Sequence, residues 1–301
     1  MRVPVARYTG GGRYGIWRAH CRRQVAAAAV FARLSLLIVF GLSAAVQAEP
    51  SADRGQERLV RNHVDFLRGS REGVSDIYFV GIAPYSTEDV FMNEATYVRN
   101  LFDAQYDTQG RSILLVNNKK TLELYPAATL KNIERVFSRI GSLIDPEEDI
   151  IVLYITSHGE KNEGITVKFE NIPHLKPDIG YLDPETIVRL LGEHRIKWRI
   201  LLLLACFSGE FLERLKDDHT LIITSAARDK SSFGCGHHGD FTQFGEAFFG
   251  RELGRSRDLI SSFHRARARV ERLERKQNLP ASEPQIFVGE KIRPLLDQVM
   301  F

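Results

Sequence analysis

Two stretches of continuous apolar sequence constrain the fold of this chain more than any other feature. Residues 149–156 (DIIVLYIT) and 198–205 (WRILLLLA) are apolar over nearly their whole length. Strands with such sequences are buried on both faces, which is typical of the centre of a parallel sheet that helices cover on both sides. We therefore expect the two segments to be adjacent, central strands of such a sheet.

Strands and helices alternate along the rest of the chain. Further short apolar runs predict strands at residues 76–83, 112–116, 220–225 and 285–288. Apolar residues spaced three and four apart, or a proline at a helix start, predict helices at residues 56–67, 87–106, 130–144, 184–192, 241–253 and 256–277. Ser86 or Thr87 is the expected cap of the second of these helices. The alternation predicts an α/β fold with a mostly parallel central sheet and helices on both faces.

The first 48 residues have the pattern of an export signal. They contain seven arginines and no acidic residue, and the apolar run 34–46 follows the basic part. This run of 13 residues suits the apolar region of a signal peptide and is short for a membrane span. Val46-Gln47-Ala48 is a small-residue cleavage site. We expect removal of residues 1–48 and export to the periplasm or the outside of the cell; the alternative is an uncleaved inner-membrane anchor.

The charge of the remaining chain gives no support for a nucleic-acid partner. Residues 49–301 carry 34 basic and 38 acidic residues, so the basic character of the whole chain comes from its N-terminus. We expect no nucleic-acid partner, and contact with a membrane only through the N-terminal segment if it is uncleaved. The expected organisation is a signal or anchor at 1–48, a linker and first helix at 49–75, and one main domain at 76–301. The sequence does not indicate an oligomeric state.

Reactive side chains follow both of the central apolar segments. His158 and Gly159 come just after the first segment, and Cys206 comes directly after the second. The carboxyl ends of parallel strands meet at one edge of a sheet, where functional side chains collect. Because neighbouring strands are about 4.8 Å apart, we expect His158 and Cys206 to face one reacting atom.

This pair of residue types suits nucleophilic catalysis. A thiolate is the reactive form of cysteine, and a nearby imidazole can take the thiol proton and later protonate a leaving amine. The acyl oxyanion that forms needs backbone N–H donors, and a glycine such as Gly159 allows the backbone to approach closely. The pattern therefore points to acyl transfer with Cys206 as nucleophile.

Three motifs in order resemble the legumain family of cysteine peptidases, in the caspase clan, and a secreted bacterial type of member. They are ITSHG at 155–159, LLLLACFSGEF at 201–211 and TSAARDKSSFGCG at 224–236, and the resemblance spans about residues 76–250. It implies a three-layer caspase-like fold, a peptide or protein substrate, and no cofactor or metal.

The same resemblance implies roles for individual residues. His158 would be the general base and acid and Cys206 the nucleophile, with Gly159 and the Cys206 amide as oxyanion hole. Ser231 and Ser232 match residues that line the pocket for the substrate side chain before the scissile bond. Glu246 lies near the position of an acid of that pocket.

The chain departs from the family pattern at two places. Leu204 stands where asparagine-cleaving legumains carry an acid. Residues 81–91 contain neither the asparagine that assists the dyad nor the arginine that lines the pocket. A preference for Asn or Asp therefore does not follow, and a pocket with Glu246 but without that arginine would suit a basic side chain.

Three other functions are compatible with the sequence. Cys235, His237 and His238, with Asp240 or His158, could supply metal ligands. A chain of this fold could also be a non-catalytic binding module. The same dyad could serve a transpeptidase, because hydrolysis and transfer share an acyl-enzyme. We expect no disulfide between Cys206 and Cys235, since a bridge would consume the nucleophile.

Overall fold

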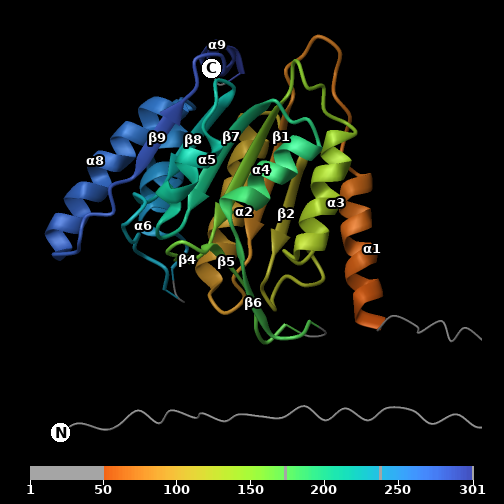
Figure 1. The fold of residues 1–301 in the computed structure, drawn as a ribbon, viewed down its shortest axis with the longest axis horizontal. Helices are drawn as coiled ribbons and strands as arrows, with labels where there is room; N and C mark the ends of the chain where they lie inside the picture. Colours follow the sequence, from red (N-terminus) through yellow and green to blue (C-terminus); the bar gives the residue numbers. More distant parts are fainter. Residues whose placement is uncertain (1–50, 173–174, 237–238, 300–301) are drawn as a thin grey trace, which may run out of the picture. The chain divides into compact units, whose positions relative to one another are not determined.

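A six-stranded sheet forms the centre of the fold (Figure 1). The computed structural model describes residues 51–172, 175–236 and 239–299. The strand order is β2-β1-β3-β7-β8-β9, and neighbours in this sheet are parallel except for the antiparallel pair β8–β9. The strands are β1 (Ile77–Ala83), β2 (Ser112–Val116), β3 (Ile150–Thr156), β7 (Trp198–Leu204), β8 (Thr220–Thr224) and β9 (Gln285–Val288). The two continuous apolar segments are β3 and β7, adjacent and central as predicted.

Side chains that alternate along the strands divide the apolar core between the two faces of the sheet. On β3, Tyr154 packs in one cluster and Leu153 in the other. The first cluster is covered by α2 (Asp89–Gln105), the helical segment η2 (Glu246–Leu253) and α8 (Leu259–Gln277). The second is covered by α1 (Ser51–Asp65), α3 (Leu130–Gly141), α4 (Pro184–Glu193) and α5 (Leu212–Leu215). The predicted arrangement of a sheet between two helical layers is confirmed.

Capping side chains mark the first residue of several helices. Asp183 caps α4 by accepting the Thr186 N–H at 2.7 Å, with Pro184 in the first helical position as predicted. The last long helix, α8, begins three residues later than predicted because the Asp258 side chain caps it. The predicted helix at 241–253 is a short α6 (Gln243–Gly245) that continues as the π-helical η2 and ends in α7 (Gly254–Ser256).

The prediction that Ser86 or Thr87 caps α2 is wrong. The N-cap position is Glu88, and its side chain makes no hydrogen bond to the helix. The Ser86 hydroxyl instead accepts the backbone N–H of Glu170 at 2.8 Å. The carboxylate of Glu88 is therefore free of the usual capping role, and it lies in the candidate active site.

A second, antiparallel sheet begins directly after His158. It consists of β4 (Gly159–Glu160), β5 (Gly164–Phe169) and β6 (Asp178–Leu182), which the sequence pattern did not predict. The N–H of Thr166 donates to the carbonyl of His158 at 2.9 Å, and the Ser157 hydroxyl donates to the Thr166 carbonyl at 2.7 Å. The small sheet thus fixes the backbone on both sides of the histidine. Short elements η1 (Ser208–Phe211) and α9 (Arg293–Val299) complete the chain.

The N-terminal predictions lie mostly outside the described residues. Residues 1–48, with the expected signal or anchor, are among those not described. The first helix, expected at 56–67, starts earlier, at Ser51, and packs on α3 through Val60 and Val64. Within residues 51–172, 175–236 and 239–299, no helix combines the length and apolar character that a bilayer crossing requires.

Candidate active site

The pairing of β3 with β7 brings the histidine and cysteine segments together. Thr156 is in register with Leu204, and the N–H of Ser157 donates to the Leu204 carbonyl at 3.1 Å. His158 and Cys206 each lie two residues beyond this last pair. A Cβ atom at Gly159 would overlap the carbonyl oxygen of Cys206, so the two segments touch and only glycine fits there.

The sulfur of Cys206 lies against Ser232, one of the predicted pocket residues. The backbone N–H of Ser232 donates to Sγ at 3.3 Å, and the thiol lies 3.5 Å from the Ser232 carbonyl oxygen. The Ser232 hydroxyl is 3.9 Å away. The loop after β8 is therefore one wall of the site around the thiol.

The chain turns sharply after Cys206. Phe207 has φ 59°, a left-handed conformation that costs a non-glycine residue about 1–2 kcal/mol. Its N–H donates to the carbonyl of Lys230 at 2.8 Å, which ties the turn to the loop that carries Ser232. Strain of this kind collects at functional sites because the surrounding structure must enforce it.

The imidazole of His158 is held on three sides by the segment that follows β1. Its ring makes edge-to-face contacts with Tyr85 and Phe91, at centroid distances of 4.5 and 5.2 Å. Both carboxylate oxygens of Glu88 lie 3.1 Å from Nε2. The side chain of His158 is 33% exposed and that of Glu88 is 17% exposed, so the ring is accessible from one side.

Sequence reasoning missed Glu88 as a site residue. The sequence placed it only in the first turn of a helix, and nothing local links it to His158, 70 residues away. The signal that could have found it is topological. Because β1 is the other neighbour of β3, the segment after β1 lies beside the residue that follows β3.

The buried carboxylate of Glu94 is hydrogen-bonded to the end of the strand that carries His158. Glu94 on α2 accepts hydrogen bonds from the hydroxyls of Tyr154 and Thr156, at 2.6 and 2.8 Å, and from the N–H and hydroxyl of Thr242, both at 2.8 Å. Burial raises the pKa of Glu94, and the four donors oppose that shift because they favour the ionised form. The carboxylate therefore joins α2, the end of β3 and the start of α6.

Cys235 differs chemically from a free surface thiol. Both Cys206 and Cys235 are free thiols in the described part of the chain, as predicted. Burial is the largest cause that raises the pKa of Cys235 to about 12, and electrostatic interactions with Cys206, Glu94 and Glu88 add to it. Cys235 packs against the apolar core. These properties are typical of a structural cysteine that does not act as a nucleophile.

The two remaining pocket candidates stay predictions. Ser231 precedes Ser232 in the same loop and is exposed. Glu246 begins η2, where its half-exposed carboxylate pairs with Arg251 at 2.6 Å. The structure thus places Ser232 on the thiol and gives Glu246 a cationic partner.

The metal alternative falls partly outside the described residues. His237 and His238 are not described. Among the residues that are, no group of three or more His, Cys, Asp or Glu side chains could hold a metal ion. The observed partner of the His158 imidazole is the carboxylate of Glu88, and Cys206 follows the neighbouring strand β7.

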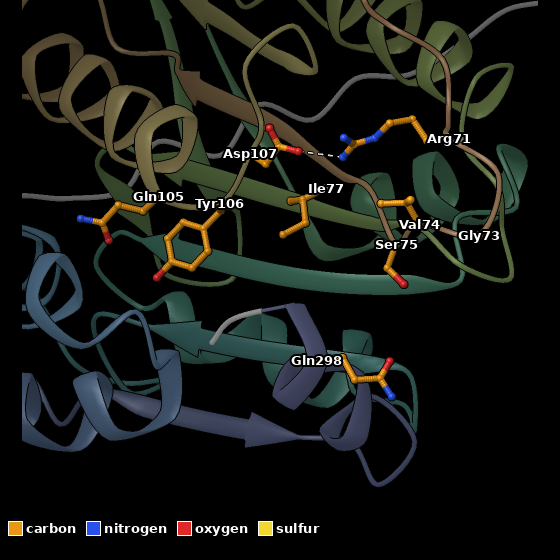
Figure 2. Close-up of a pocket in the computed structure, with 9 residues that line it drawn as sticks. All are labelled: Arg71, Gly73, Val74, Ser75, Ile77, Gln105, Tyr106, Asp107 and Gln298. Atoms are coloured by element: carbon orange, nitrogen blue, oxygen red, sulfur yellow. Dashed lines mark hydrogen bonds and ion pairs between the residues drawn. The ribbon is translucent and has the colours of Figure 1, made fainter.

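A pocket of about 400 Å³ lies at the opposite edge of the sheet, where β1 begins (Figure 2). An ion pair of 2.7 Å between Arg71 and Asp107 crosses its rim. Its lining residues are Arg71, Gly73, Val74, Ser75, Ile77, Gln105, Tyr106, Asp107 and Gln298. Since β1 and β3 are parallel, this pocket is at the amino ends of the strands and His158 is at the carboxyl ends. It is therefore separate from the candidate active site.

Comparison with protein families decides the classification. The model of the peptidase C13 family matches residues 128–293, more than half of the 301-residue chain. The chain belongs to the peptidase C13 family. This is the legumain family, so the resemblance of the three motifs to that family is confirmed, and membership indicates a cysteine peptidase. That the chain is a secreted bacterial member stays a prediction. The matched range contains His158 and Cys206 but does not reach Glu88.

Two solved structures align with this C13 chain over most of their own length. A caspase-1 from Spodoptera frugiperda is 14% identical with a TM-score of 0.45, over 71% of this chain and 86% of that one. A protein named drICE is 13% identical with a TM-score of 0.41, over 74% and 91%. No curated protein sequence matches the chain. Family membership rests on the C13 match and the fold class on the sheet described above.

Proposed function

We propose that the protein is a cysteine endopeptidase in which His158 and Cys206 form the catalytic dyad. The observation that carries the proposal is the β3–β7 register, with Gly159 packed on the carbonyl of Cys206. A family match that includes both residues supports it. The strained turn at Phe207 is a second support, because it sets the thiol apart from the regular strand.

The reaction proceeds through a thioester. The Cys206 S–H bond breaks as His158 takes the proton, and the sulfur forms a bond to the carbonyl carbon of the scissile peptide. The N–H groups of Gly159 and Cys206 stabilise the oxyanion. The C–N bond then breaks and His158 gives its proton to the leaving amine. Water attacks the thioester with His158 as base, and the C–S bond breaks to release the acid and the thiol.

The substrate is a peptide or protein whose side chain before the scissile bond enters a pocket by Ser231 and Ser232. The contact of Ser232 with Sγ supports this location, because the pocket must lie beside the nucleophile. Glu246 is the proposed acid of the pocket, and its pairing with Arg251 would have to open for it to bind a basic side chain.

A peptide-library cleavage assay on the full-length protein tests the proposal. We expect cleavage by the wild type and none by Cys206→Ala, whereas Glu163→Gln, an exposed change in the loop between β4 and β5, keeps the wild-type rate. Products formed with an added amine would reveal transpeptidation. Binding of peptides without any covalent intermediate at Cys206 would identify a non-catalytic module and refute the proposal.

We also propose that the enzyme is exported and that residues 1–48 are removed. The support is the sequence pattern of basic stretch, apolar run and small-residue site. Mass spectrometry of the chain from each cell fraction should find Glu49 as the first residue outside the cytoplasm. A membrane-bound chain that still carries Arg22 and Arg23 would establish the anchor instead.

A further inference from the structure

The contact between Glu88 and His158 is the feature of the site that the proposed dyad leaves unexplained. Both carboxylate oxygens lie 3.1 Å from Nε2, within hydrogen-bond distance of the same nitrogen. The strand order β1-β3-β7 places the segment after β1 on one side of His158 and Cys206 on the other. The three side chains therefore follow three adjacent parallel strands in the order Glu88, His158, Cys206.

The position of Glu88 on its helix favours a role outside helix stability. Glu88 is the N-cap residue of α2, a position that prefers short side chains such as Ser, Thr, Asp or Asn. Its side chain makes no capping hydrogen bond and reaches His158 instead. Without a capping side chain, the 17-residue helix α2 is less stable than it would be with serine or aspartate at this position. The Glu88 side chain instead contacts His158.

We propose that Glu88 is a positioning residue that holds His158 in the orientation and tautomer needed to serve Cys206. A carboxylate accepts the Nε2–H, so the neutral ring keeps its lone pair on Nδ1. Nδ1 is then the atom that takes the thiol proton. Tyr85 and Phe91 prevent the ring from swinging away, since both pack edge-to-face on it. This inference rests on the proposed function of the dyad.

Glu88 also supplies charge where the reaction needs it. When the S–H proton moves to Nδ1, the ring becomes an imidazolium with one proton on each nitrogen. The carboxylate of Glu88, 3.1 Å from Nε2, stabilises that cation without taking a proton from it. The chain thus uses an acid to assist the dyad, in the segment where the family pattern has an asparagine that is missing here.

Replacement of Glu88 by serine separates positioning from stability. Serine is a better N-cap, so Glu88→Ser should raise Tm by about 2–4 °C. The same change removes the partner of His158 and should lower kcat about 100-fold, with KM within about threefold of the wild type. The matched control, Glu163→Gln, removes a carboxylate from an exposed loop and should change neither quantity. Values of kcat within about threefold of the wild type in Glu88→Ser would overturn the proposal.

A spectroscopic measurement tests the pairing without any turnover. In protein with ¹⁵N-labelled histidine and the Cys206→Ala change, His158 is assigned by comparison with His158→Gln. We expect the Nε2–H proton of the neutral ring to be shifted downfield by its hydrogen bond to the Glu88 carboxylate, and to lose that shift when Glu88→Ser is added. An unchanged Nε2–H chemical shift would overturn the inference. If the chemical shift changes but wild-type protein cleaves no peptide, the pairing holds and the proposed peptidase function fails, so the two failures are distinguishable.

Discussion

Replacement of the buried Glu94 by glutamine is the sharpest test of how the site is supported. The carboxylate accepts two donors at each oxygen: the Tyr154 and Thr156 hydroxyls at one, and the N–H and hydroxyl of Thr242 at the other. A glutamine has one oxygen and one NH₂ group in the same space. Since a backbone N–H cannot rotate away, the amide oxygen must stay on Thr242 and the NH₂ group must face the two hydroxyls.

The magnitude follows from what the two hydroxyls lose. Tyr154 and Thr156 are fully buried, so without the carboxylate oxygen their protons have no acceptor at this position. An unpaired buried donor costs about 1–3 kcal/mol, and two such groups at about 1.5 kcal/mol each give about 3 kcal/mol. In a domain of this size, 1 kcal/mol shifts Tm by about 2–4 °C, so Glu94→Gln should lower Tm by about 6–12 °C.

Scanning calorimetry with urea unfolding measures both Tm and the free energy of unfolding. The matched control is Glu72→Gln, the same chemical change at an exposed residue, which should stay within about 0.5 kcal/mol of the wild type. A Glu94→Gln protein within about 1 kcal/mol of the wild type would refute the reasoning. Gly245→Ala offers an independent check, because its Cβ would overlap the Glu94 carboxylate and should destabilise the same junction.

Three further outcomes test the chemistry of the site. Cys206→Ala and His158→Ala should each lower kcat by about 10³-fold or more. Because the two residues act as a unit, kcat of the double variant should be little lower than that of either single variant. If the two reductions in kcat multiply in the double variant, the dyad is contradicted. Gly159→Ala should abolish cleavage while circular dichroism stays unchanged, since the added Cβ displaces the carbonyl of Cys206. With a pKa of about 12, Cys235 has about 10⁻⁴ of its thiol ionised at pH 8. Its alkylation by iodoacetamide, read by peptide mass, should therefore be slow and rise about tenfold per pH unit up to pH 12. Fast labelling near neutral pH would contradict the raised pKa of this thiol.

Much of the fold was predictable from local sequence because the signals are strong and local. The segments at 149–156 and 198–205 are too apolar to lie anywhere except in the middle of a covered sheet, and β3 and β7 are central neighbours. The strand β9 at 285–288 and the start of α4 were also predicted from apolar character and from Asp183-Pro184. The order of motifs after these strands predicted the family that the C13 match confirms.

Other elements were missed because their signals are weak or shared. The strand β4 has only two residues and β6 is largely exposed, so no apolar pattern marks these two. In β5, Ile165, Val167 and Phe169 alternate with polar residues, so its pattern could have predicted a strand. The place of these strands is set by pairing with residues next to His158, which is a tertiary contact. The cap of α2 was assigned to Ser86 or Thr87 from propensity, but the hydroxyl of Ser86 accepts the N–H of Glu170, the residue after β5.

The sequence by itself therefore determined the class of fold and the family, and it predicted the two residues of the proposed dyad. It did so because apolar runs and reactive side chains at strand ends are properties of short segments. Only the tertiary structure decided what surrounds those residues. Glu88 reaches His158, and Glu94 reaches Thr242 across 148 positions, because β1 and α2 pack beside β3. Contacts between segments so far apart depend on strand order, which no local pattern encodes.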